Sequence, residues 1–292
     1  MKRSGSLLEL IGTLDEENAA RVRRVLEGGV KIPPQPRVIQ ELRKLVAQRR
    51  LDVRLLADTI QRDPGLAAML FKVVGNAAYR AHQPFDSVER IIHAVGVDQT
   101  LNLAVSLSSA LSVRKEWQVY EAFWARSQAV GHLAMLIADE RIAVCNVFPD
   151  QAYLAGIFHA CGVPLLLQRF PTYCQEMRLG VPGHWTDWRE EDRKFNTDHA
   201  VVGYLVARHW HLPEFICAAI RYQYAMAELG EHEARSLVAI LALAQEIHAR
   251  AQRQPNPEWP AARAAALPEI GLNDDALPEF VDVVLERYNS AA

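Results

Sequence analysis

Imidazole, thiol and carboxylate side chains, the groups that most often bind metals or attack substrates, are spread through the 292-residue chain. Among the ten histidines, His159 ends an apolar segment and His199 directly follows Asp198. The four cysteines form no Cys-x-x-Cys pair, and Cys161 lies in an apolar segment where a raised thiol pKa and low reactivity are expected. No Gly-x-Ser-x-Gly elbow, P-loop or dinucleotide fingerprint occurs. The histidines are therefore site candidates without a complete catalytic motif around them.

The elements that must position these side chains are helices. The chain contains 41 Ala and 33 Leu, the two strongest helix-favouring apolar residues, against 15 Gly and 15 Pro. No alternating apolar run is long enough to require a sheet. The sequence therefore predicts an all-α fold, a compact multi-helix bundle with no significant sheet. Helices are expected at about 37–48, 53–62, 64–75, 87–95, 99–113, 117–143, 150–162, 164–169, 187–194, 198–210, 213–226, 233–251 and 275–289.

Three regions are expected along the chain. Residues 1–30 are predicted to form an N-terminal helix, residues 31–250 the main domain, and residues 251–292 a C-terminal linker and helix. The linker is placed at Gln252 to Pro260. The apolar positions of the last helix would let it dock on the domain or on a second copy, so a homodimer is an open alternative. The charges of 187–194 are interpreted as a solvated face.

Charge and hydropathy exclude several functions. The net charge is -3 and the pI is near 6.4, which argues against a protein that mainly neutralises nucleic-acid phosphates or an anionic membrane. The basic residues near the N-terminus lack interleaved aromatic residues for base stacking. No apolar run approaches the length of a membrane span, and no signal segment is evident. We therefore expect no nucleic acid, no membrane and a cytoplasmic location.

Several short motifs, taken in order, resemble those of HDOD domains. The first part contains Ile32-Pro33-Pro34-Gln35-Pro36, Asp63-Pro64, Val73-Val74-Gly75-Asn76-Ala77-Ala78-Tyr79, Phe85-Asp86-Ser87-Val88 and Ile91 to Gly96. The later part contains Phe123-Trp124-Ala125-Arg126-Ser127, Leu154 to His159, Asp198 to Gly203, Trp210, Leu212-Pro213 and Ala219-Ile220-Arg221. Each motif is weak alone, but their order and spacing over residues 31–250 are specific.

The resemblance implies a helical domain related to the HD metal-dependent phosphohydrolases and generally without demonstrated hydrolase chemistry. The HD enzymes hold divalent ions with histidines and aspartates, and those ions activate water. The corresponding positions here are Arg126, His159-Ala160, Val163, His199, Tyr222-Gln223 and Gln245. A cation at Arg126 repels a metal, and the two aspartate positions hold a methyl group at Ala160 and an amide at Gln245. We therefore expect a degenerate metal site with no catalytic residue, no metal and no cofactor.

The surviving residues leave several interpretations open. His159 and His199 could be a two-histidine remnant that still binds zinc or copper. Alternatively, both imidazoles donate to backbone carbonyls in the core while Asp198 caps the helix that begins at His199. In a third interpretation, Arg126 and the two histidines surround a weak anion or nucleotide pocket, since guanidinium matches phosphate geometry. A buried Arg126 paired with a local acid is the alternative to that pocket.

The leading functional hypothesis is a non-catalytic signalling module. Such a module would bind a signalling protein partner or a small anionic or nucleotide ligand through the helical scaffold. The alternative is a divergent metal-dependent phosphohydrolase or nucleotide second-messenger phosphodiesterase, with the unconventional ligands His159, His199, Asp198 and Gln245. A third class is a purely structural or assembly protein that dimerises through residues 251–292.

Overall fold

The computed structural model describes residues 36–46, 52–74, 85–109, 117–179, 181, 184–230 and 232–291. Within these ranges every regular element is a helix, which confirms the all-α prediction. The N-terminal helix predicted for residues 1–30 lies outside the described residues. The helices are α3 (Pro36–Val46), α4 (Val53–Gln61), α5 (Pro64–Val74), α6 (Val88–Val95), α7 (Val97–Ser109), α8 (Trp117–Cys145), α9 (Pro149–Phe158), α10 (Val163–Arg169), α11 (Tyr173–Glu176), α12 (Trp188–Phe195), α13 (His199–His209), α14 (Glu214–Tyr222), the 3₁₀ turn η2 (Met226–Leu229), α15 (Arg235–Ala251), α16 (Trp259–Glu269) and α17 (Leu277–Ala291).

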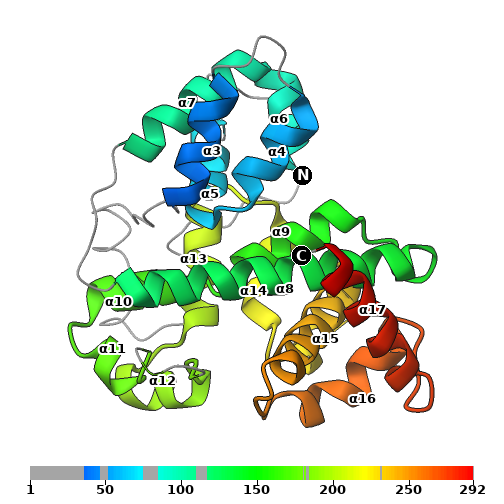
Figure 1. Ribbon diagram of the computed structural model, residues 1–292. Helices are drawn as coiled ribbons and strands as arrows, with labels where there is room; N and C mark the ends of the chain where they lie inside the picture. Colours follow the sequence, from blue (N-terminus) through cyan, green and yellow to red (C-terminus); the bar gives the residue numbers. More distant parts are fainter. Residues whose placement is uncertain are drawn as a thin grey trace, which may run out of the picture.

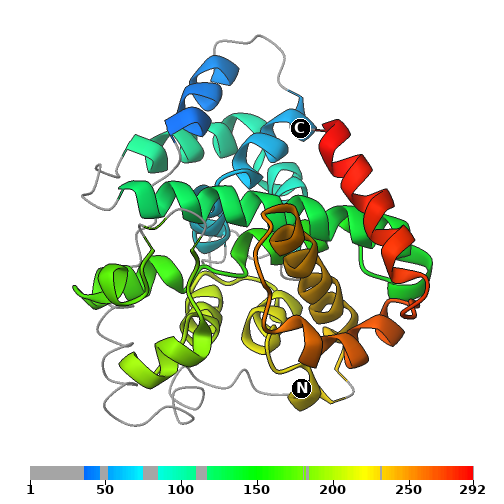
Figure 2. The same ribbon diagram turned by 60° about the horizontal axis from the view of Figure 1, so that its bottom comes forward.

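Helix α8 runs through the middle of the molecule and separates two groups of helices (Figure 1). Helices α3 to α7 pack mainly on one another on one side of α8. In the second group, α9 and α15 pack directly on α8 and on each other, and α16 packs on α15. The turned view shows the same division (Figure 2). The second group holds all the predicted site residues except Arg126, which α8 itself carries.

Aspartate caps fix the starts of the helices that carry the site. The Asp187 carboxylate accepts from the backbone N–H groups of Arg189 and Glu190 at the start of α12. Asp198 accepts from the backbone N–H groups at positions 200 and 201, which confirms its predicted capping role at α13. Between them, α12 ends at Asn196 in the left-handed conformation, with φ of 54°. This short corner folds α12 back onto α13.

Two glycines allow helices to approach at backbone distance around the end of α9. A Cβ added at Gly156 would lie 2.4 Å from the Cα of Gly131 on α8. A Cβ at Gly162 would lie 2.2 Å from the carbonyl oxygen of His199 on α13. Neither distance is compatible with a side chain. Residues 156–162, which include His159, are therefore held directly between α8 and α13.

The C-terminal region contains more helix than the sequence predicts. The predicted linker ends early, because Trp259 and Pro260 already belong to α16, a helix that the sequence interpretation missed. The predicted terminal helix exists as α17 and docks on α8, with Phe280, Val281 and Val284 buried. Arg287 pairs with Asp139 and Glu140 of α8 at the edge of this contact. The docking uses the apolar face from which a homodimer was inferred as an alternative.

Candidate functional site

The positions predicted to correspond to HD metal ligands come from five helices, and several of them are linked by hydrogen bonds. Arg126 lies on α8, His159 directly follows α9, and His199 opens α13. Tyr222 ends α14, Gln223 follows it, and Gln245 lies on α15. Gln223, Gln245, His199 and the His159 carbonyl belong to one chain of polar contacts, in which Tyr224 is the central member. We refer to this as the polar chain.

One end of the polar chain is a buried ion pair between His199 and Glu191. The His199 Nδ1 and the Glu191 Oε2 atoms are 2.7 Å apart, and both side chains are at most 1% exposed. The same carboxylate accepts from the His199 backbone N–H and from the hydroxyls of Tyr173 and Thr186. The charge of His199 and these donors outweigh burial and hold the pKa of Glu191 below its usual value. Burial lowers the pKa of His199, but the Glu191 charge outweighs it and raises that pKa. Both shifts favour the ionised form of the pair.

From His199 the polar chain continues through three side chains and ends at a backbone carbonyl. The His199 Nε2 lies 2.9 Å from the Tyr224 hydroxyl, which reaches the Gln245 Oε1 in a long contact of 3.5 Å. The Gln245 amide donates to the Gln223 Oε1 at 3.2 Å. Gln223 donates in turn to the backbone carbonyl of His159 at 2.8 Å. Polar side chains that would otherwise be buried without partners thus satisfy one another.

The His159 imidazole is a neutral core group. Its Nδ1 donates to the backbone carbonyl of Gly156 at 2.6 Å, as one sequence interpretation expected. Burial, aided by the charge of Arg126, holds its pKa well below the usual value. Its Nε2 has no hydrogen-bond partner. The same interpretation was wrong for His199, because its imidazole binds the Glu191 carboxylate and not a backbone carbonyl.

Arg126 carries the least compensated charge of the site. No carboxylate of the described residues lies within 4.0 Å of its guanidinium, so the expected pairing with a local acid is not found there. Instead the guanidinium carbon lies 5.2 Å from the ring centre of Trp185. The Arg126 Nε is buried without a partner, and burial lowers the pKa of the group.

A cavity of about 260 Å³, hereafter the arginine cavity, lies over this region. Its walls come from Arg126, residues 184–188, Tyr224, Gln245 and residues 254–258. Of the three residues predicted to form a ligand pocket, Arg126 lines this cavity, whereas His159 and His199 are not among its described walls.

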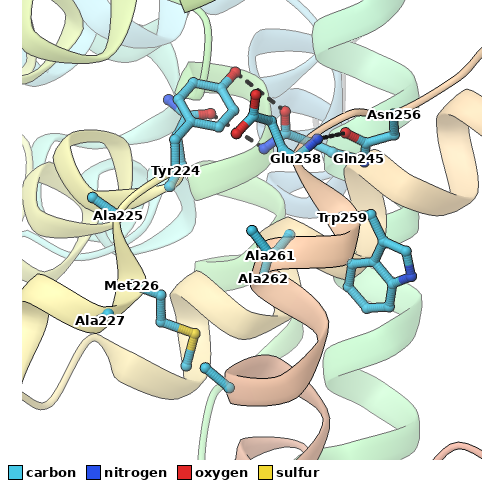
Figure 3. A pocket seen from close by; sticks show the side chains of 13 residues that line it. Tyr224, Ala225, Met226, Ala227, Gln245, Asn256, Glu258, Trp259, Ala261 and Ala262 are labelled. Atoms are coloured by element: carbon cyan, nitrogen blue, oxygen red, sulfur yellow. Dashed lines mark hydrogen bonds between the residues drawn. The ribbon is translucent and has the colours of Figure 1, made fainter.

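A second cavity of about 180 Å³ adjoins the first (Figure 3). Tyr224, Gln245, Asn256 and Glu258 line both cavities. In Figure 3 these polar side chains gather at one end, whereas the far end is lined by Met226 and by alanines, among them 225, 227, 261 and 262. The second cavity is therefore mainly apolar beyond its shared wall.

The donor set does not fit a divalent metal ion. Within the described part of the chain, no group of three or more His, Cys, Asp or Glu side chains is arranged to hold a metal. Ala160 offers no donor atom, and the Gln245 amide is engaged in the polar chain. A guanidinium at Arg126 adds positive charge where a dication would need negative ligands.

Sequence reasoning missed two residues that organise the site, Glu191 and Tyr224. Glu191 lies in the charged helix interpreted as a solvated face, yet it is fully buried, so that interpretation was wrong at this position. Its neighbours on the same helical face are Trp188 and Phe195, three residues before and four after. That apolar spacing was the available signal. Tyr224 follows α14 in a turn, and no sequence pattern distinguishes it.

Several known proteins are similar to this chain. A protein of Treponema pallidum (strain Nichols) is 22% identical over 219 residues, which are 73% of this chain but 41% of that protein. This chain therefore spans less than half of that relative's length. A response regulator, MmoQ, from Methylococcus capsulatus str. Bath matches in structure with a TM-score of 0.68 at 23% identity, covering 86% of this chain and 98% of its own. A virulence factor from Campylobacter jejuni subsp. jejuni matches with a TM-score of 0.63 at 15% identity, covering 90% and 92%. These structural likenesses establish a shared fold.

The family model of the HDOD domain matches residues 32–226. The match covers the helices from α3 to α14 and ends before α15, which supplies Gln245. It agrees with the motif order in the sequence and with the helical fold. The chain belongs to the HDOD domain family.

Proposed function

We propose that this protein is a non-catalytic regulatory module whose helical scaffold recognises a signalling protein partner or a small ligand. The observation that carries the proposal is the polar chain. Three side chains at positions that resemble metal-ligand positions of HD enzymes, His199, Gln223 and Gln245, are hydrogen-bonded here to Tyr224, to each other or to the His159 carbonyl. The response-regulator name of one protein of the same fold supports a regulatory role.

The chemistry of phosphate-ester hydrolysis supports the non-catalytic part of the proposal. A metal-dependent hydrolase needs anionic oxygen ligands to hold its dication and lower the pKa of bound water. Ala160 and Gln245 supply no negative charge at the aspartate positions. The carboxylate of the polar chain belongs to Glu191, which already accepts four hydrogen bonds, two of them from His199. Recruiting that carboxylate to a metal would break the pair.

Metal content and turnover test this proposal together. The purified full chain is analysed for bound metals and assayed for phosphodiester hydrolysis with added Mn²⁺ or Fe²⁺. We expect far less than one metal ion per chain and no turnover above the blank. The His159→Ala variant should behave as the parent does. Stoichiometric metal with hydrolysis that His159→Ala abolishes would overturn the proposal in favour of a divergent phosphohydrolase.

The proposal places the protein in the cytoplasm, without a cofactor. Within the described residues no helix combines the length and the apolar character that crossing a bilayer requires. We propose a monomeric domain as the functional unit, because the apolar face of α17 is already covered by α8. Light scattering of the full chain at several concentrations tests this point. A stable dimer at low micromolar concentration would contradict it.

A further inference from the structure

Three residues that line the arginine cavity each carry a buried N–H donor without a hydrogen-bond partner. The donors are the Nε of Arg126 and the indole Nε1 atoms of Trp185 and Trp188, and all three atoms are buried. Buried donors in folded proteins are nearly always paired with protein or water. Three such donors on residues that line one cavity favour a ligand that brings acceptor atoms from outside the chain.

The chemistry of the three groups selects the ligand. Guanidinium and indole N–H groups can only donate hydrogen bonds, so the ligand must supply acceptor atoms. The Arg126 charge lacks a carboxylate within 4.0 Å among the described residues, which favours an anion. The two acids in the wall are already engaged. Asp187 accepts from the first N–H groups of α12, and Glu258 pairs with Arg189.

The volume of the cavity suits a small organic ligand that is larger than a bare oxyanion. Its volume of about 260 Å³ is comparable with that of roughly nine water molecules in the liquid. The adjoining cavity in Figure 3 offers an apolar extension past Tyr224 and Gln245. We propose that the arginine cavity binds a small organic anion, with its carboxylate or phosphate oxygens on Arg126 and the indole N–H groups and its apolar or ring-shaped body toward Met226.

This inference deepens the proposed function, because a module without hydrolytic metal would hold such a ligand and leave it unchanged. It names Arg126, Trp185 and Trp188 as the binding residues. Of these, only Arg126 was a candidate from the sequence. The ligand would bridge α8, the 184–188 segment and the 254–258 segment, which are far apart along the chain.

Thermal shift and calorimetry on the full chain test the inference with defined probes. AMP represents phosphate esters, benzoate represents carboxylates, inorganic phosphate represents the bare anion, and adenosine is the uncharged control. We expect AMP or benzoate at millimolar concentration to raise the melting temperature, since a ligand that binds only the native state stabilises it. Adenosine should produce no shift. No shift and no heat with AMP, benzoate or phosphate would refute the inference.

Matched variants locate the binding. Arg126→Met should raise the dissociation constant of AMP or benzoate about 10- to 100-fold, which is the range for losing a hydrogen bond to a charged group. Trp185→Phe keeps the ring and removes one N–H donor, so it should weaken binding less. Arg141→Met is the control, because Arg141 also lies on α8 over an aromatic ring, that of Phe280 at 4.6 Å, and away from the cavity walls. Equal affinity in parent, Arg126→Met and Trp185→Phe would place the ligand elsewhere and overturn the assignment.

The outcome also separates this inference from the proposed function. If AMP binds and is cleaved, the non-catalytic proposal fails while the binding site stands. If no probe binds and the protein holds no metal and hydrolyses nothing, the binding inference fails while the non-catalytic proposal stands. If Arg126→Met does not fold, the Trp185→Phe comparison alone decides the location.

Discussion

The buried pair of Glu191 and His199 predicts a pH-dependent loss of stability when its carboxylate is neutralised. Glu191→Gln keeps the shape of the side chain and removes the charge that compensates the imidazolium. Breaking a buried pair by removing one partner costs about 3–5 kcal/mol. We expect a loss of this size at pH 5.5, where His199 is protonated in both the folded and the unfolded chain.

The sign of the pH dependence follows from the two pKa shifts. The pKa of His199 is raised above 6.5, so its contribution to stability is complete below pH 6.5 and is lost as pH rises through the folded value. The pKa of Glu191 is lowered below 4.5, so its contribution is complete above pH 4.5 and is lost as pH falls through the folded value. The stability difference between parent and Glu191→Gln should therefore be largest between pH 4.5 and pH 6.5. At high pH the imidazole is neutral. The free energy of unfolding of the variant should then be lower than that of the parent by only about 1–3 kcal/mol, because its hydrogen bonds are imperfect.

Urea denaturation followed by circular dichroism measures these differences, with the midpoint and slope fitted at each pH. Glu190→Gln is the control, since the neighbouring Glu190 is 29% exposed and pairs with Lys194 at 3.1 Å on the surface. Such a pair contributes about 0–1 kcal/mol. The reasoning is refuted if Glu191→Gln costs no more than Glu190→Gln at pH 5.5, or if its cost grows toward pH 8.

Three further predictions concern other parts of the site. Gly156→Ala places a Cβ 2.4 Å from the α8 backbone and should cost about 3 kcal/mol or more in a thermal melt. Gly230→Ala meets no atom within 4 Å but lies at φ of 58° and ψ of -147°, a conformation essentially restricted to glycine, and should cost about 1–3 kcal/mol of backbone strain; a loss at Gly156 smaller than at Gly230 would contradict the close approach. Gln223→Leu leaves two backbone carbonyls without the donor that reaches them at 2.8 and 3.0 Å, so the urea midpoint should fall by an amount equivalent to about 1–3 kcal/mol, and an unchanged midpoint would speak against the polar chain. In the native protein a thiol reagent should modify the partly exposed Cys174 well before Cys161, which is fully buried with a raised thiol pKa; peptide mapping that finds Cys161 modified first would disprove this order.

The helical framework was predictable because its signals are local. Asp52, Ser87 and Asp187 each precede a helix, and each accepts a backbone hydrogen bond from its first turn. The α16 helix was missed because residues 252–260 were interpreted as a linker and no helix was predicted directly after them. Pro260 in fact occupies the first turn, where its missing N–H has no intrahelical acceptor to lose.

The residues that come together at the site could be predicted from the sequence, but the groups that contact them could not. Gln223 and Gln245 lie together because the fold that the motifs indicate brings their helices together. The spacing of Trp188 and Phe195 is only a weak signal for the burial of Glu191, which depends on how α12 folds back at Asn196. Likewise, the wall formed by residues 254–258 depends on the packing of α16 against α15.

The backbone contacts on both sides of α9 have a mechanical consequence. Gly156 meets α8 and Gly162 meets α13 without any side chain between them, so this segment cannot slide against either neighbour without a steric clash. It is a stiff segment beside the polar chain. The walls of the arginine cavity at residues 184–188 and 254–258 are irregular segments apart from the first turn of α12. A change in the contents of the cavity would therefore be transmitted outward through α12 and α16, and those two helices are where a displacement should be measured.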